Sequence, residues 1–155
     1  MPKPPSRRAR PVSPTGKGGA TSAGSLRVAP MSAIVPMLRE AGIDPRALLA
    51  EFGLEPSYFE DPDNVIPFTT MGRILLRCVE RTGCEHFGLL VGKHSGVSVL
   101  GAIGYLVQSA PDLRTALREL SAYLHVHDGG AVVTLSEDKP VATLGYAILS
   151  DGVEG

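Results

Sequence analysis

The segment SAPDLRTALRELSAYLHVHDGGAVVTLSEDKPVATLGYAIL, residues 109–149, changes its hydrophobic period once along its length. Its first half predicts an amphipathic helix, in which Ser109 and Asp112 have the spacing of an N-terminal capping box. The apolar residues that we expect on the buried face of this helix are Leu113, Ala116, Leu117, Leu120, Tyr123 and Leu124. After a Gly-Gly pair, two β-rich runs flank a polar turn, which predicts a β-hairpin over residues 131–149.

Upstream of this segment, glycine and proline residues divide the chain into short helical patterns. The expected helices are residues 31–41, 45–52, 67–82, 85–94 and 97–108. Asp44 followed by Pro45 predicts a helix start, and Gly42 and Gly83 are expected stop signals. The last of these helices is almost wholly apolar, so we expect it to be buried. The sequence therefore predicts an α+β fold, in which a layer of several short helices precedes an antiparallel β-hairpin or small sheet.

Basic and acidic residues are divided unevenly along the chain. Residues 1–30 carry six basic residues and no acidic residue, whereas residues 31–155 carry nine basic and sixteen acidic residues. The first segment is rich in Pro, Gly and Ser, so we expect residues 1 to about 29 to be a disordered leader. Such a leader either solubilises the chain or contacts nucleic-acid phosphates without specificity. The sequence contains no apolar run of about 18 residues, and no membrane-spanning helix is expected.

The sequence offers no recognisable catalytic group. No serine or cysteine has a neighbouring base that the pattern can identify, so we expect no enzymatic activity and assign no catalytic residue. Glycine motifs that bind phosphate or dinucleotides are also missing, and no cofactor is expected. Cys78 and Cys84 would lie on different faces of one helix, which favours two free thiols in a reducing compartment.

The run His125-Val126-His127-Asp128 is the cluster that most resembles a metal site. On a strand both imidazoles would point to one face, as a divalent metal requires. At a helix C-terminus they would diverge and interact with the negative end of the helix dipole. Because no glutamate follows at the spacing of a cupin site, we assign no metal ligand. A stand-alone protein that binds a metal or small molecule through these histidines stays as the alternative hypothesis.

The order of the motifs, from about residue 34 to residue 154, resembles the N-terminal regulatory domain of AraC-family transcriptional regulators, in the arabinose-binding-domain-like subgroup. The matching motifs are Ala41-Gly42-Ile43-Asp44 with Leu48-Leu49, Asp61-Pro62-Asp63 with Ile66-Pro67, Phe87-Gly88-Leu89, Gly101-Ala102-Ile103-Gly104-Tyr105, Ser109-Ala110-Pro111 with Ala116-Leu117 and Leu120, Tyr123, and Asp128-Gly129. The resemblance covers about four fifths of the chain.

This resemblance implies a cytoplasmic bacterial regulator whose N-terminal domain senses a small effector or mediates dimerisation. It also implies that DNA binding belongs to a C-terminal helix-turn-helix domain, which we expect to be absent from this chain. We accordingly expect residues 1–30 to be the leader and residues 31–155 to be a regulatory domain that is incomplete at its C-terminus.

We expect the effector to bind in a pocket between the helical layer and the sheet. The residues that we predict to line it are Tyr105, Tyr123, His125 and His127. An interaction domain without any ligand is a further alternative.

Overall fold

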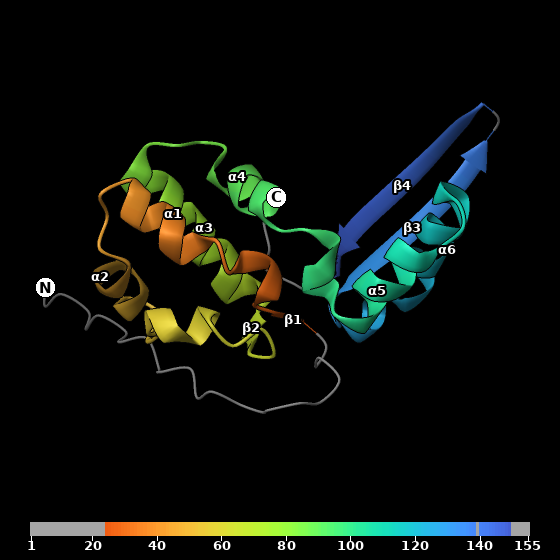
Figure 1. Ribbon diagram of the computed structural model, residues 1–155. Helices are drawn as coiled ribbons and strands as arrows, with labels where there is room; N and C mark the ends of the chain where they lie inside the picture. Colours follow the sequence, from red (N-terminus) through yellow and green to blue (C-terminus); the bar gives the residue numbers. More distant parts are fainter. Residues whose placement is uncertain (1–23, 139, 150–155) are drawn as a thin grey trace, which may run out of the picture.

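The computed structural model describes residues 24–138 and 140–149, which form two lobes (Figure 1). We call residues 24–96 the helical lobe and the described residues from 97 to 149 the hairpin lobe. The elements of the helical lobe are β1 (Ser25–Arg27), the 3-10 helix η1 (Ala29–Met31), α1 (Ile34–Glu40), α2 (Pro45–Ala50), the 3-10 helix η2 (Pro56–Phe59), β2 (Val65–Pro67), α3 (Phe68–Thr82) and α4 (Phe87–His94). The elements of the hairpin lobe are the 3-10 helix η3 (Val97–Leu100), α5 (Ala102–Ser109), α6 (Leu113–Tyr123), the 3-10 helix η4 (Leu124–Val126), β3 (Ala131–Asp138) and β4 (Val141–Ile148). The expected α+β class is confirmed.

Local signals in the sequence set the ends of the helices in the helical lobe. The side chain of Asp44 caps α2 by accepting a hydrogen bond from the amide of Arg46 at 2.9 Å, and Pro45 is the first helical residue. Gly42 and Gly83 follow α1 and α3 with φ of +73° and +67°, which glycine adopts without steric cost. The helices expected at these positions are confirmed, although α1 begins three residues later than expected because residues 29–31 form η1.

The apolar core lies in the helical lobe. Its fully buried large side chains are Val28, Ile34, Leu38, Leu48, Leu49, Ile66, Ile74, Cys78 and Val91. Helix α3 contributes Met71, Ile74 and Cys78 from one face, as its amphipathic pattern predicts. None of the helices in the described residues is long and apolar enough to cross a membrane.

Strand β1 corrects the prediction that residues 1 to about 29 are disordered. It pairs antiparallel with β2, with Leu26 opposite Ile66, and Leu26, Val28 and Ala29 are buried. The prediction is therefore wrong for residues 24–29, because a partner forty residues away supplies hydrogen bonds and apolar cover that this short segment lacks on its own. Residues 1–23 lie outside the described part of the chain.

The predicted buried helix over residues 97–108 is also wrong. The chain forms η3, turns at Gly101 with φ of +59°, and then forms α5. Only Ile103 and Gly104 of α5 are buried. A side chain on Gly104 would collide with the carbonyl oxygen of Val97, so only glycine allows the backbone to approach itself this closely in the turn.

Helix α6 is capped by Asp112, whose carboxylate accepts a hydrogen bond from the amide of Thr115 at 2.9 Å. Ser109 takes no part in this cap, because its hydroxyl donates to the carbonyl of Leu106. The expected buried stripe of α6 is wrong: none of its residues is buried, and Leu113 is 74% exposed. The helix packs mainly against α5 and β3, and its apolar residues stay partly or fully exposed.

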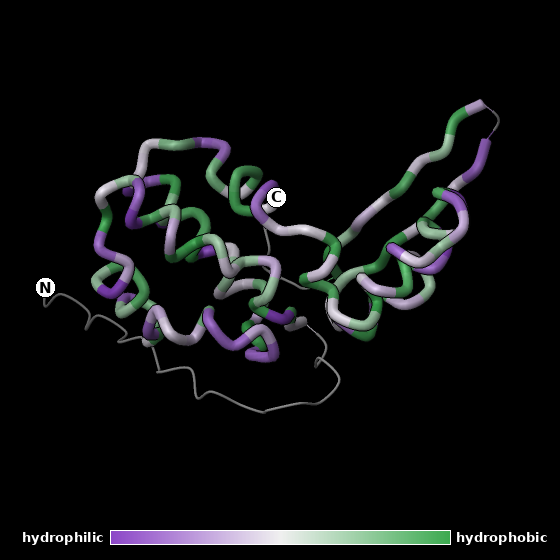
Figure 2. Tube along the Cα trace, viewed as in Figure 1, coloured by the Kyte–Doolittle hydropathy of each residue, from purple (hydrophilic) through white to green (hydrophobic). Residues whose placement is uncertain are grey.

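The expected hairpin is confirmed. Strands β3 and β4 pair antiparallel over eight residues each, with Leu135 opposite Leu144 and Val133 opposite Tyr146. Glu137 ties β3 to α6 by accepting hydrogen bonds from the guanidinium of Arg118 at 3.1 and 3.2 Å. Figure 2 shows β4 in pale or hydrophobic colours along most of its length, and no charged residue occurs in it.

We predict that Gly130→Ala destabilises the protein by about 1–3 kcal/mol, because overpacking a filled site forces its neighbours apart. An added Cβ would lie 2.7 Å from the Phe68 ring and 3.0 Å from the Cα of Gly24. Urea unfolding followed by circular dichroism measures the change. The control is Gly92→Ala on α4, where nothing lies within 4 Å of the added Cβ. That variant should be neutral or more stable, and an equal loss in both variants would contradict the prediction.

Candidate functional site

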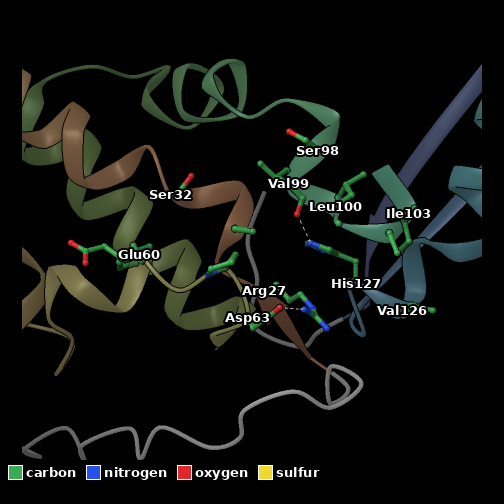
Figure 3. Close-up of a pocket in the computed structure, with 15 residues that line it drawn as sticks. Arg27, Ser32, Glu60, Asp63, Ser98, Val99, Leu100, Ile103, Val126 and His127 are labelled. Carbon is green, nitrogen blue, oxygen red and sulfur yellow. Dashed lines mark hydrogen bonds and ion pairs between the residues drawn. The ribbon is translucent and has the colours of Figure 1, made fainter. Parts of the chain in front are cut away.

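A cavity of about 630 Å³ lies between the helical lobe and the hairpin lobe (Figure 3). The residues that line it from the helical lobe are Arg27, Ala29, Ser32, Phe59, Glu60, Pro62 and Asp63. Those that line it from the hairpin lobe are Ser98, Val99, Leu100, Gly101, Ala102, Ile103, Val126 and His127. The walls are mainly apolar, and the charged side chains are concentrated on the helical lobe.

Arg27 and Asp63 form an ion pair at the wall of the cavity. The pairing of β1 with β2 positions them, because Arg27 lies opposite Val65 and Asp63 comes two residues before Val65. Asp63 lies in a turn in which its backbone amide donates a hydrogen bond to the carboxylate of Asp61 at 3.1 Å. Arg27 is the more enclosed partner, with 26% of its side chain exposed against 61% for Asp63.

His127 closes the cavity on the side of the hairpin lobe. It is 6% exposed, and its Nε2 lies 3.2 Å from the carbonyl oxygen of Val99 in η3. A carbonyl oxygen only accepts, so Nε2 carries the proton and Nδ1 is free to accept a hydrogen bond. Burial has the largest effect and lowers the pKa of His127 below its usual value. The hydrogen bond to Val99 raises this pKa in part, the positive charge of Arg27 lowers it, and Asp128 has the smallest, raising effect. The imidazole is therefore held in its neutral form.

Asp128, the residue that follows His127, connects the two lobes. Its backbone forms an antiparallel bridge to Leu26 of β1. Its carboxylate accepts hydrogen bonds from the Tyr146 hydroxyl of β4 and, at 3.2 Å, from the amide of Gly130. Burial raises the pKa of Tyr146, and the bond to Asp128 raises it further, so the phenol stays protonated and donating. This buried carboxylate sets the position of its neighbour His127.

The structure does not bring the four predicted site residues together. His127 lines the cavity, whereas Tyr105 is 76% exposed on α5, Tyr123 is 49% exposed at the end of α6, and His125 is exposed on η4. Sequence reasoning missed Arg27, because it lies in a segment that the composition assigned to a disordered leader. Asp63 had a signal, since it belongs to the turn motif Asp61-Pro62-Asp63 that carried the family resemblance.

Other chemistry has little support in the part of the chain that the structure describes. No group of three or more His, Cys, Asp or Glu side chains is arranged there to hold a metal ion. The expected free thiols of Cys78 and Cys84 are confirmed. Burial raises the pKa of the Cys78 thiol to about 11, so this thiol is not a reactive nucleophile at neutral pH.

Residues 42–154 match the family model described as the arabinose-binding domain of AraC transcription regulators, N-terminal. The chain is also similar to the HTH-type transcriptional regulator VirS of Mycobacterium tuberculosis strains CDC 1551 and H37Rv. In both cases 26% of 119 residues are identical, covering 76% of this chain and 35% of the relative. The chain thus spans about a third of the length of the curated relatives that it matches. Arg27 precedes the matched segment, whereas Asp63 and His127 lie within it.

We predict that His127 contributes to the pH dependence of stability. Because folding lowers the pKa of His127 below its unfolded value of about 6.5, the unfolded chain takes up the proton first as the pH falls. The contribution of neutral His127 to stability is complete above that pH and is lost on acidification. The free energy of unfolding of the wild type should therefore fall more steeply between about pH 7 and 5 than that of His127→Gln.

Urea unfolding at a series of pH values measures both slopes. His125→Gln is the matched control, because His125 is two residues away but exposed. This control should keep the wild-type dependence of the free energy of unfolding on pH. If His127→Gln also keeps it, His127 does not contribute to the pH dependence and the prediction is wrong.

Proposed function

The chain belongs to the family of N-terminal arabinose-binding domains of AraC transcription regulators, and from this premise we propose that it senses a small effector and thereby controls transcription. This family consists of regulatory domains of transcription factors and is not a class of enzymes. The relatives that it matches are named as helix-turn-helix regulators. We therefore propose that a DNA-binding unit contacts the DNA, and that effector binding to this domain is transmitted to that unit.

The observation that supports this proposal is the cavity between the two lobes. Its walls come from η1, η2 and β1 on one side and from η3, α5 and η4 on the other. A ligand that contacts both walls favours one relative position of the lobes, because binding shifts a protein toward the conformation with the better contacts. The hairpin lobe would then carry the signal outward. We propose His127 as an effector-binding residue, since it lines this cavity.

A ligand that fills the cavity should be excluded by Ala102→Trp. Ala102 lines the cavity at the start of α5 and is exposed, so the indole ring has room to project without disturbing the core. Compounds from a panel of metabolites that raise the melting temperature of the wild type should lose that effect in Ala102→Trp. A ligand at a hundred times its Kd stabilises by about 2.7 kcal/mol, which a thermal-shift measurement detects.

The matched control is Ala122→Trp on α6, since Ala122 is also exposed and does not line the cavity. It should retain every stabilisation seen with the wild type. Stabilisation that survives in Ala102→Trp would locate the ligand elsewhere. If no compound of any charge class stabilises the wild type, the domain is an interaction module without a ligand and the proposal fails.

We also propose that the domain associates with a second copy of itself through β4. The nine residues 141–149 carry no charge that would protect a strand edge from pairing. Leu144, Tyr146 and Ile148 share a face and are 45%, 53% and 39% exposed. Antiparallel pairing of β4 with the β4 of a second copy about a twofold axis would oppose these uncharged side chains and give one closed, symmetric interface.

Leu144→Lys tests this association, because the twofold axis would bring two like charges close together near the centre of the strand. Sedimentation velocity over a concentration series should detect dimers of the wild type and only monomers of the variant. Leu113→Lys is the control, since Leu113 is 74% exposed on α6 and outside the strand. A wild type that stays monomeric throughout the series would overturn the proposal.

A further inference from the structure

We infer that the cavity between the lobes takes a small organic carboxylate with an apolar body, whose carboxylate binds Arg27 in place of Asp63. This inference rests on the proposed effector-binding function and names the class of effector. It follows from the distribution of apolar surface, positive charge and unused hydrogen-bond donors over the walls of the cavity.

The apolar body of the ligand is required by the shape and chemistry of the walls. Phe59 and Pro62 face the cavity from the helical lobe, and Val99, Leu100 and Ile103 face it from the hairpin lobe. Phe59 and Ile103 are 3% and 9% exposed, so these walls are firmly packed from behind. A hydrocarbon chain or ring between them is stabilised because it removes apolar surface from water.

The polar end of the ligand is specified by Arg27. Among the described residues that line the cavity, Arg27 is the one side chain with a permanent positive charge. Three quarters of it are buried, and its one hydrogen bond within the described residues runs from Nη1 to Asp63. A guanidinium has five N–H donors in a planar fork that matches a carboxylate, and within the described residues most of the Arg27 donors have no partner. His127 is neutral and does not compete for the anion.

Asp63 holds the position of the ligand carboxylate while the cavity is empty. Its side chain is 61% exposed, so the Asp63 carboxylate keeps much of its contact with water while it is paired with the more enclosed Arg27. Returning Asp63 to water therefore costs little. An incoming carboxylate gains more from Arg27, because its own apolar body seals the pair from solvent and weakens dielectric screening. The exchange replaces one carboxylate by another and leaves the charge of Arg27 balanced.

Two hydroxyl groups extend the same site. Ser32 and Ser98 line the cavity from opposite lobes, and neither side chain has a hydrogen-bond partner within residues 24–138 and 140–149. In Figure 3 both hydroxyls lie apart from the group formed by Arg27, Asp63 and His127. Hydroxyls donate readily to polar oxygens, so each lobe can contribute a donor to a polar substituent on another part of the ligand.

An amine or a neutral ligand would use the site differently. Asp63 and Glu60 supply carboxylates to the lining, and an ammonium group would bind to Asp63. In Figure 3 the Glu60 side chain points away from the group formed by Arg27 and His127. The two ligand classes give opposite results when Asp63 is neutralised: a carboxylate loses its competitor, whereas an amine loses its partner.

The experiment measures binding of octanoate, octylamine and octanol to the full chain by calorimetry and by thermal shift. Octanoate should bind most tightly. Arg27→Gln should weaken octanoate binding about tenfold or more, because the charged hydrogen bonds to the guanidinium are lost. The isosteric Asp63→Asn should strengthen it several-fold, because a competing carboxylate is removed. Octylamine affinity that exceeds that of octanoate, or a weaker octanoate affinity in Asp63→Asn, would overturn the inference.

Two further variants separate the inference from its premise and from loss of folding. Arg27→Lys keeps the positive charge without the fork, so it should retain part of the octanoate affinity that Arg27→Gln loses, and circular dichroism checks that both variants fold. Ala102→Trp should block octanoate if it occupies the cavity. Ligands of another class that are blocked by Ala102→Trp, with no octanoate binding, would refute the carboxylate class and leave the sensor function standing.

Discussion

The fold depends on the backbone pairing of three residues, Ser25–Arg27, between two distant parts of the chain. On one side β1 pairs with β2, and on the other Leu26 bridges to Asp128 at the base of the hairpin lobe. Because these pairings join residues about 40 and 100 positions apart, they close two long loops of the described chain around one short strand. The apolar side chain of Leu26 then becomes part of the core that supports α1 and α3.

The cavity is a consequence of the same pairing. The register of β1 brings Arg27 next to Asp63, while the bridge at Asp128 brings His127 to the other wall. Tyr146 reinforces the bridge, because its hydroxyl donates to the Asp128 carboxylate from the end of β4 that lies at the base of the hairpin. One wall of the cavity, on the helical lobe, is charged, and the other, on the hairpin lobe, is apolar. A ligand that contacts both walls would favour one relative position of the two lobes. This is the behaviour required of a regulatory domain.

Sequence reasoning reached part of this site and missed the part that depends on distant contacts. The family resemblance included Asp63 and Asp128-Gly129, and His127 was named as a candidate. The two tyrosines were chosen for their chemistry and their position on apolar helices, but α5 and α6 pack on one side only and leave Tyr105 and Tyr123 exposed. Arg27 could not be found, since the segment that precedes it is rich in Pro, Gly and Ser, and its partner Asp63 lies beyond α1 and α2.

The sequence by itself determined the elements whose hydrogen bonds close within a few residues. Asp44 and Asp112 cap helices through amides two or three residues away, Gly42 and Gly83 end helices by their own φ angles, and the hairpin pairs neighbouring runs. Only the tertiary structure decided that β1 is a strand, that the helix expected over residues 97–108 breaks, and that a cavity forms. Those outcomes depend on contacts between residues far apart in the chain, whose free energy no local pattern contains.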